Sequence, residues 1–289
     1  MKPVLGTVLF ALGIIVLAIP ANAGPYEDGI EATQQGDYAT ALQLWRPLAE
    51  QGHALVQSHL GYMYENGKGV PQNDAKAVKW YRKAAEQDYG EAQYNLGVMY
   101  HLGKGVPQDD AEAMKWFHKA AVQGVAEAQF KLGLMFDAGE SVPQNYAEAL
   151  KWYRMSAEQG YATAQFNVGD LYAKGDGVPQ DDAEAVKWYR KAAEQGYAKA
   201  QNNLGVSYAI GAGVPQNYIF AHMWFSLATT QGHERAQEGR DIAASNLTPG
   251  QVAEAQRMAR EWLEKHQQPS TAFSKVPRPR PTNQQPPTS

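Results

Sequence analysis

The chain has 289 residues, a formal net charge of −4 and no cysteine. Without disulfides its stability has to come from packing, and a chain of this length can bury a large core. The net charge is negative and the sequence has no basic stripe, which argues against a protein that binds the phosphates of a nucleic acid.

Residues 1–23 have the pattern of a secretory signal peptide. A lysine precedes an apolar run over residues 4–19, and Ala21 and Ala23 provide the small-x-small motif of a cleavage site. The apolar run is shorter than the about 20 residues that a membrane span needs, so cleavage after Ala23 is favoured over an uncleaved anchor. We therefore expect a periplasmic or secreted protein without stable membrane insertion.

Residues 24–52 predict a short helical hairpin whose turn is Gln35-Gly36-Asp37, and residues 53–232 then consist of five units of 36 residues without an insertion. A strict period in this range indicates one supersecondary unit stacked many times, each burying its apolar face against its neighbours. The tryptophans that mark the period are Trp80, Trp116, Trp152, Trp188 and Trp224, and Leu44 takes their position in the first hairpin.

Each unit predicts two amphipathic helices. In the first helix Leu96 and Met99 share an apolar face, and Gly97 beside it would let a neighbouring helix approach closely. In the second helix Trp80 and several alanines form the apolar stripe. We expect the tryptophan rings to be buried between consecutive helices.

The turn between the two helices contains two glycines and a proline, as in Gly67-Lys68-Gly69-Val70-Pro71. It lacks the Lys-Ser/Thr pair and the preceding strand of a phosphate-binding loop, so an interhelix turn is favoured. A strong N-cap residue follows each turn, and a glutamate three residues later predicts a capping box in three units. The N-caps are Asn73, Asp109, Asn145, Asp181 and Asn217, and the glutamates are Glu112, Glu148 and Glu184.

Residues 233–266 predict C-terminal capping helices. Arg240 and Asp241 take the positions that leucine and glycine hold in the preceding unit, as suits a terminal repeat that faces water. Thr248 and Gln251 predict the capping box of a last helix, which would seal the stack as a C-terminal lid.

Residues 267–289 are rich in proline and glutamine, carry three basic residues and contain no acidic residue. This composition predicts a disordered tail, for which a solvated extension is favoured over contact with an anionic surface.

The unit pattern Ala-Gln-Tyr-Asn-Leu-Gly-Val-Met-Tyr, then Gly-Lys-Gly-Val-Pro-Gln, then Ala-Val-Lys-Trp-Tyr-Arg-Lys-Ala-Ala-Glu-Gln-Gly resembles the Sel1-like repeat family. The resemblance implies an all-α fold, a right-handed α-solenoid of stacked hairpins of the tetratricopeptide type, and usually a protein-binding scaffold. Asp88 and Ser141, in place of turn glycines, and Met223, in place of a lysine, are departures that do not threaten this fold. A cysteine-rich subgroup with its own ligand chemistry is not matched by a chain without cysteine.

Residues for catalysis, for a cofactor or for a metal are not apparent in the sequence. The seven histidines lack the His-x-x-x-His spacing that places two imidazoles on one helical face. Ser207 misses the nucleophile-elbow pattern and takes a position that methionine holds in other units. Glutamates that recur once per unit are better explained by capping than by paired acid and base chemistry.

A binding site, if present, should use residues that vary between otherwise regular units. By the resemblance to tetratricopeptide proteins, the first helix of each unit would line a concave groove, and its exposed position starts with His59. Amide side chains there could bind extended peptide backbone, although helix surfaces are also often polar only for solubility. The candidate partner-binding residues are Asn95, Lys131, Asn167 and Asn203.

The leading hypothesis is a non-enzymatic, exported scaffold that binds a protein or peptide in this groove, without a cofactor and without nucleic acid. Two alternatives are a hydrolase acting on cell-wall or antibiotic substrates and a passive spacer that holds its two ends apart. Turnover of such substrates would favour the hydrolase, and failure to capture any partner would favour the spacer.

Overall fold

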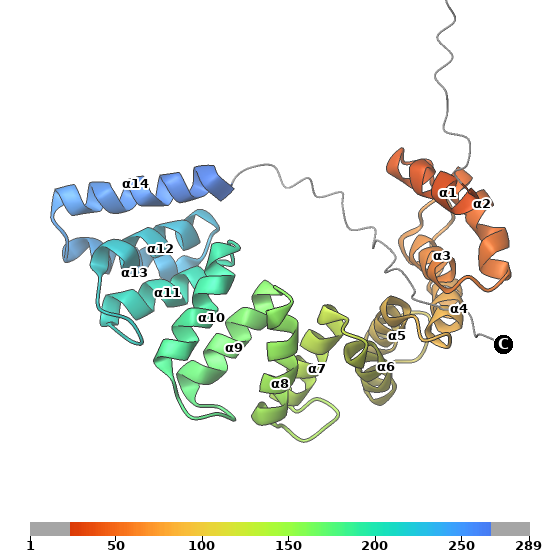
Figure 1. The fold of residues 1–289 in the computed structure, drawn as a ribbon, viewed down its shortest axis with the longest axis horizontal. Helices are drawn as coiled ribbons and strands as arrows, with labels where there is room; N and C mark the ends of the chain where they lie inside the picture. Colours follow the sequence, from red (N-terminus) through yellow and green to blue (C-terminus); the bar gives the residue numbers. More distant parts are fainter. Residues whose placement is uncertain (1–23, 267–289) are drawn as a thin grey trace, which may run out of the picture. The chain divides into compact units, whose positions relative to one another are not determined.

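The computed structural model describes residues 24–266, and every regular element in this range is an α-helix (Figure 1). The all-α fold of stacked helical hairpins is therefore confirmed. The predicted signal peptide and the predicted tail lie outside the described residues. No helix within residues 24–266 combines the length and the apolar character that a membrane crossing requires.

The described helices belong to two compact units. The first unit, which ends at Gln123, contains α1 (Pro25–Gln34), α2 (Tyr38–Glu50), α3 (Ala54–Asn66), α4 (Asp74–Ala85), α5 (Gly90–Leu102) and α6 (Asp110–Val122). The second unit, which starts at Gly124, contains α7 (Ala126–Ala138), α8 (Tyr146–Glu158), α9 (Ala162–Lys174), α10 (Asp182–Glu194), α11 (Ala198–Ile210), α12 (Tyr218–Thr230), α13 (Glu234–Ser245) and α14 (Pro249–His266).

Within each unit the helices pair in chain order. In the first unit α1 packs on α2, α3 on α4 and α5 on α6; in the second unit α7 packs on α8, α9 on α10 and α11 on α12. Each hairpin also packs on the next one of its unit, for example through α8 and α9 or α10 and α11. The apolar faces are therefore buried between sequence neighbours, as expected for a repeat protein.

A glycine of the first helix lets the second helix of the hairpin approach it closely. A Cβ atom on Gly133 of α7 would lie 2.4 Å from the ring of Tyr153 of α8, closer than real side chains come. Tyr153 is fully buried over this glycine. The expectation that the repeating glycine permits close helix packing is confirmed. The equivalent pairs are Gly61 with Tyr81, Gly97 with Phe117, Gly169 with Tyr189, and Gly205 with Phe225.

The tryptophans next to these buried rings are less buried than we expected. The rings of Trp188 and Trp224 are buried, whereas those of Trp80, Trp116 and Trp152 are only half-buried. Successive residues on a helix point about 100° apart, so the tryptophan and the aromatic residue after it cannot both face the partner helix. The expectation of burial was therefore wrong for three of the five tryptophans.

The five predicted N-caps are confirmed, whereas the three predicted capping boxes are wrong. In α10 the side chain of Asp181 accepts a hydrogen bond from the N–H of Glu184, as predicted. The carboxylate of Glu184 does not accept a hydrogen bond from the N–H of Asp181. It accepts one from Trp188 Nε1 at 3.0 Å and forms an ion pair with Lys187 at 2.7 Å. The N–H of Asp181 already donates to the Tyr172 carbonyl at 2.9 Å, so it is not available to the glutamate. Glu112 and Glu148 pair with Lys115 and Lys151 in the same way.

Two turn positions hold a residue other than glycine in the left-handed region. The φ angle is 62° at Ser141 and 59° at Asp88. The equivalent turn of the next repeat has Gly177 at a φ of 69°. The helices on both sides of Ser141 and Asp88 form normally, so the two departures leave the fold intact, at a conformational cost that only glycine avoids.

The last helix, α14, covers the end of the second unit by packing on α12. Ala255 is fully buried, and the Trp262 ring lies edge-on to Trp224 with 6.3 Å between centroids. The predicted capping box is confirmed, because the N–H of Thr248 donates to Gln251 Oε1 at 2.9 Å and the N–H of Gln251 donates back to Thr248 Oγ1 at 3.4 Å.

Candidate functional site

The predicted partner-binding residues lie on the first helices of successive hairpins. Asn95 is on α5 in the first unit, and Lys131, Asn167 and Asn203 are on α7, α9 and α11 in the second unit. All four are half-buried, so part of each side chain is open to solvent. His59 holds the same position on α3. We call the side of the first helices that carries this position the first-helix face.

Asn203 is bound to a buried tyrosine and an aspartate inside the second unit. Its Nδ2 lies 3.3 Å from Asp170 Oδ1, and the hydroxyl of Tyr189 donates to the same oxygen at 2.7 Å. The Lys174 ammonium pairs with Asp170 Oδ2 at 3.3 Å. Burial, followed by the hydrogen bond to Asp170, raises the pKa of the Tyr189 hydroxyl, so this group remains a proton donor. Asn203 thus supports its own hairpin as well as facing solvent.

Asn167 has a similar arrangement one repeat earlier. It hydrogen-bonds to the hydroxyl of Tyr153, which donates to Asp137 Oδ2 at 2.9 Å. Burial and the negative charge of Asp137 raise the pKa of this hydroxyl.

The sequence contains a signal for these tyrosine clusters that our sequence analysis missed. Wherever the buried aromatic residue is tyrosine, asparagine follows fourteen residues later, whereas Phe117 is followed by Lys131 at the same distance. An asparagine that hydrogen-bonds to a tyrosine hydroxyl has no such partner beside phenylalanine. Tyr153 hydrogen-bonds to Asn167 and Tyr189 to Asn203, whereas Tyr81 and Asn95 share only the spacing.

In the first unit the first-helix face carries a stack of aromatic rings around His59. The imidazole centroid lies 4.9 Å from Trp45 and 6.2 Å from Tyr26, whose ring is nearly parallel to it. His59 Nε2 is buried and has no hydrogen-bond partner among the described residues. Burial lowers the pKa of His59 to about 4, so the imidazole is neutral at neutral pH.

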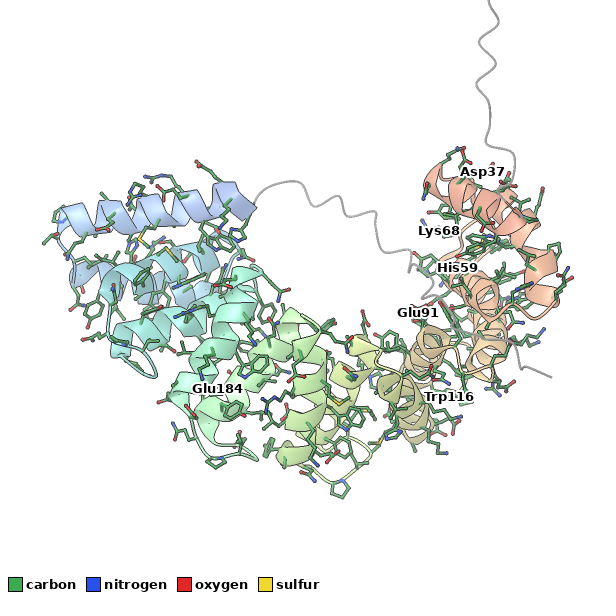
Figure 2. All side chains as sticks on the ribbon, viewed as in Figure 1. Asp37, His59, Lys68, Glu91, Trp116 and Glu184 are labelled. Carbon is green, nitrogen blue, oxygen red and sulfur yellow. The ribbon has the colours of Figure 1, made fainter. Side chains whose placement is uncertain are left out.

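Acidic side chains lie beside this stack. The hydroxyl of Tyr89 donates to the carboxylate of Glu91 on α5. Burial, and then the charges of Glu27 and Glu91, raise the pKa of Tyr26. His59 and Glu91 can both be located in Figure 2. Sequence analysis missed this cluster because Tyr26 and Trp45 come from the first hairpin, which departs from the 36-residue pattern.

The chemistry of the first-helix face is suited to binding. Asparagine amides donate and accept hydrogen bonds without titrating, and the tyrosine hydroxyls with raised pKa values stay protonated, so they supply no phenolate as a general base. Within residues 24–266, no three histidine, aspartate or glutamate side chains come together to hold a metal ion.

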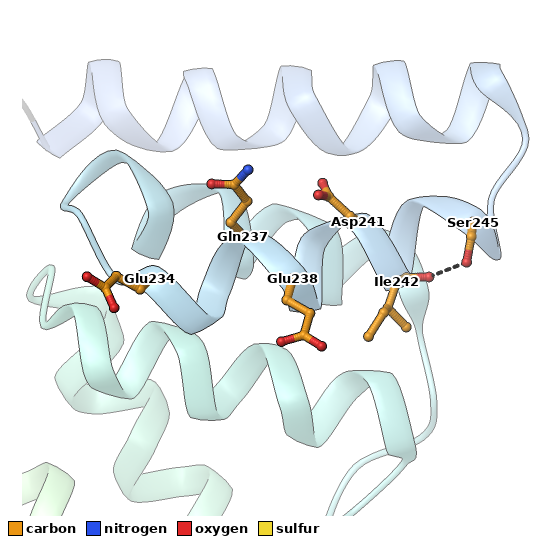
Figure 3. Close-up of a pocket in the computed structure, with 6 residues that line it drawn as sticks. All are labelled: Glu234, Gln237, Glu238, Asp241, Ile242 and Ser245. Atoms are coloured by element: carbon orange, nitrogen blue, oxygen red, sulfur yellow. Dashed lines mark hydrogen bonds between the residues drawn. The ribbon is translucent and has the colours of Figure 1, made fainter.

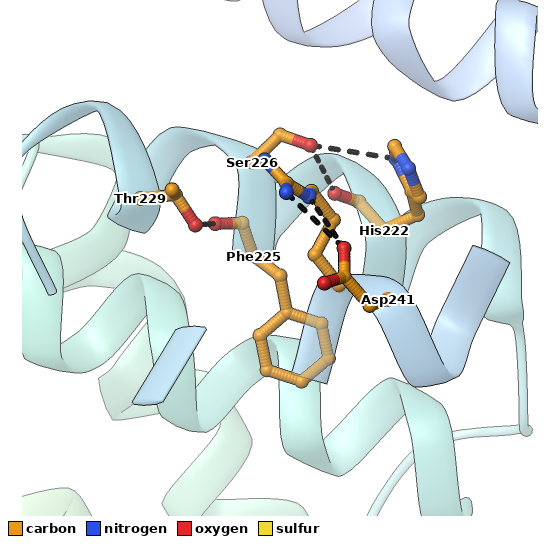
Figure 4. Close-up of polar contacts among 6 residues, drawn as sticks. His222, Phe225, Ser226, Thr229 and Asp241 are labelled. Carbon is orange, nitrogen blue, oxygen red and sulfur yellow. Dashed lines mark hydrogen bonds and ion pairs between the residues drawn. The ribbon is translucent and has the colours of Figure 1, made fainter. Parts of the chain in front are cut away.

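A serine and a histidine lie together elsewhere, on α12 (Figure 4). Ser226 Oγ is 3.4 Å from His222 Nδ1, yet it donates a 2.7 Å hydrogen bond to the His222 backbone carbonyl. Asp241, the carboxylate nearest in the view, pairs with Arg240 at 3.1 Å. The serine hydroxyl donates to the backbone and the aspartate is paired with an arginine. Ser226, His222 and Asp241 therefore lack the hydrogen bonds that connect the residues of a catalytic triad.

Comparison with protein families finds a match to the Sel1 repeat at residues 21–53, 54–89, 90–125, 126–161, 162–197 and 198–233. Among solved structures, the chain is 35% identical to a Sel1 repeat protein from Oxalobacter formigenes, over 86% of this chain and 99% of that chain, with a TM-score of 0.69. It is 30% identical to c5321, a protective antigen present in uropathogenic Escherichia coli strains that displays an SLR fold, over 84% of this chain and 68% of that chain, with a TM-score of 0.45. The search of curated proteins finds no match.

Proposed function

The chain belongs to the Sel1 repeat family, and we propose that it is an exported scaffold that holds a peptide or protein partner on its first-helix face. The Sel1 repeat fold is commonly a protein-interaction scaffold, and proteins with this repeat are generally non-catalytic. The export part of the proposal is supported by the sequence pattern of residues 1–23.

One observation carries the binding proposal. In five successive repeats, the same position of the first helix holds a polar side chain that is half-buried, and therefore both positioned and accessible. An extended peptide presents donors and acceptors at regular intervals, which such side chains within one unit, for example Lys131, Asn167 and Asn203 of the second unit, can meet without a deep pocket. The five residues are His59, Asn95, Lys131, Asn167 and Asn203.

The test uses Asn95 and Lys131, because Asn167 and Asn203 also hold buried tyrosine clusters and their replacement would disturb the fold. A photo-reactive amino acid is placed at either position in the full chain, and at Lys151 on the exposed surface of α8 as the control. We expect a partner to cross-link from Asn95 in the first unit and from Lys131 in the second unit, each position being tested by itself, and not from Lys151.

The cross-linked partner is then purified and titrated with the single variant at the position that captured it, Asn95→Ala or Lys131→Ala. A polar contact contributes about 0.5–1.5 kcal/mol, so losing one should weaken binding roughly two- to tenfold while leaving helicity unchanged. Cross-linking only from Lys151, or unchanged affinity of the folded variant, would remove the first-helix face from consideration. Absence of any cross-linked partner would favour the passive spacer.

A further inference from the structure

The last hairpin departs from the repeat at positions that form the core elsewhere. His222 of α12 replaces the valine, leucine or methionine of the other repeats, and Thr229 replaces alanine. In α13, Arg240 replaces leucine or valine, Asp241 replaces glycine, and Ala244 replaces the tyrosine or phenylalanine. Four of these five changes introduce a polar group where every earlier repeat has none.

The five substituted residues meet at one cavity of about 560 Å³ between α12, α13 and α14. Ser226 and Thr230 of α12 and Val252 and Gln256 of α14 complete its lining. The volume lies within the roughly 300–1,000 Å³ of small-molecule sites. Exposure to water at the end of the array accounts for Asp241, whose side chain is 62% exposed, and does not account for His222, which is only 3% exposed.

The charges in the cavity balance. Nε and Nη2 of Arg240 both donate to Asp241 Oδ1, at 3.2 and 3.1 Å, which leaves Arg240 Nη1 and Asp241 Oδ2 outside the ion pair. Burial and the positive charge of Arg240 lower the pKa of His222, so the imidazole adds no charge at neutral pH. The site therefore combines one cation and one anion.

The hydroxyl groups of the lining supply acceptors. Ser226 Oγ, Thr229 Oγ1 and Thr230 Oγ1 each donate their proton to a backbone carbonyl of α12, at 2.7–2.8 Å. Their oxygen lone pairs can therefore accept hydrogen bonds from a ligand. Acceptors on α12 thus stand opposite the guanidinium of Arg240 on α13.

We propose that this cavity binds a small zwitterion that carries an ammonium and a carboxylate, the chemistry of a free amino acid. The carboxylate accepts hydrogen bonds from Arg240, and the ammonium donates to Asp241 Oδ2 and to hydroxyl oxygens of α12. A zwitterion pairs both protein charges and adds no net charge, whereas a singly charged ligand meets attraction from one of them and repulsion from the other. Ala244 and Val252 leave an apolar wall for its side chain.

Calorimetry and thermal unfolding of the purified chain with a panel of amino acids test the proposal. Acetate and methylammonium serve as singly charged probes, and glycerol serves as a neutral polar probe. We expect at least one amino acid to bind saturably and to raise the unfolding temperature, since a ligand of the native state stabilises it. The three small probes should do neither.

Variants then locate the binding. Arg240→Leu restores the residue of earlier repeats and should weaken binding of that amino acid at least tenfold, as should Asp241→Asn, which preserves the side-chain shape. Glu238→Gln is the matched control, because Glu238 lies on the side of α13 turned away from α14 (Figure 3). No binding by any amino acid, equal binding by acetate or glycerol, or unchanged affinity in a folded Arg240→Leu or Asp241→Asn variant would overturn the proposal.

Discussion

The side-chain amide of Gln195, just after α10, donates a 2.7 Å hydrogen bond to Oε1 of Gln165 near the start of α9. Gln165 is buried and donates in turn from Nε2 to the Ala157 carbonyl at the end of α8, at 3.0 Å. This relay ties a hairpin to the preceding one through a polar contact inside the core. The same glutamine pair recurs as Gln87 with Gln57, Gln123 with Gln93, Gln159 with Gln129, and Gln231 with Gln201.

Replacing Gln165 by Leu should lower the free energy of unfolding by about 1–3 kcal/mol, because two hydrogen bonds of about 0.5–1.5 kcal/mol each are lost, one to the Ala157 carbonyl and one from Gln195. The Ala157 carbonyl keeps the N–H of Gly160 as a donor. Replacing the exposed Gln195 by Leu should cost less, since it removes only the hydrogen bond to Gln165. Urea unfolding followed by circular dichroism measures both variants. Equal costs at the two positions would contradict the role assigned to the buried amide.

Tyr153 should matter more to stability than its neighbour Trp152. Tyr153→Ala removes a fully buried ring and should cost about 3–5 kcal/mol, whereas Trp152 is half-buried and its replacement should cost clearly less. Tyr153→Phe is the control, because it retains the packing and loses only the bonds of the hydroxyl to Asp137 and Asn167. A larger loss in urea midpoint for Trp152→Ala would show that the helix faces are assigned wrongly.

The stability of the first unit should depend on the protonation of His59. Its pKa in the folded state, about 4, lies below the ordinary value of 6.5, so the unfolded chain binds the proton more readily between these values. The free energy of unfolding should therefore fall as the pH drops from 6.5 to 4, by up to ~3 kcal/mol from this residue, and stay level above pH 6.5.

His59→Asn, which introduces the residue found at this position in three other repeats, should remove that part of the pH dependence. Unfolding of the unsubstituted chain and of the His59→Asn variant at a series of pH values gives the contribution of His59 as the difference in free energy. The carboxylates are the same in both chains, so their contributions cancel. Nuclear magnetic resonance titration of the His59 ring provides the second measurement. A midpoint near the ordinary value would refute the buried, neutral state.

Ser141→Gly should stabilise the second unit. Ser141 has a φ of 62°, where a side chain costs about 1–2 kcal/mol and glycine does not, although glycine adds about 0.5–1 kcal/mol of chain entropy. The net gain should be about 0.5–1 kcal/mol, visible as a higher urea midpoint. Gly177→Ser, in the equivalent turn, should have the opposite effect; its Cβ would also meet the backbone of Ala147 at 2.4 Å.

The chain purified from its native compartment should begin at Gly24, because Ala21 and Ala23 satisfy the small-residue requirement of signal peptidase. N-terminal sequencing and the mass of the intact protein measure this. Replacing Ala23 by a bulky residue should block processing and leave the chain at the membrane, whereas the same change at Gly24 serves as the control. A native chain that still starts at Met1 would favour an uncleaved anchor.

The sequence alone determined the helices, their N-caps and the glycine contacts of this protein. These features depend on backbone geometry within one hairpin. Each recurs with the period, so every unit provides another example of the same pattern. Gly133 is an example, since a glycine in mid-helix at every repeat has few explanations other than close packing.

Tertiary structure decided which side chains from different helices meet. Glu184 binds Trp188 and Lys187 because the N–H that it would have capped is taken by the Tyr172 carbonyl, from another helix. His222 and Arg240 differ from the repeat in sequence, yet only the packing of α14 on α12 makes them line one open cavity. The period of the sequence predicts which face of each helix is apolar. Contacts between side chains of different helices depend on the positions of three helices relative to one another.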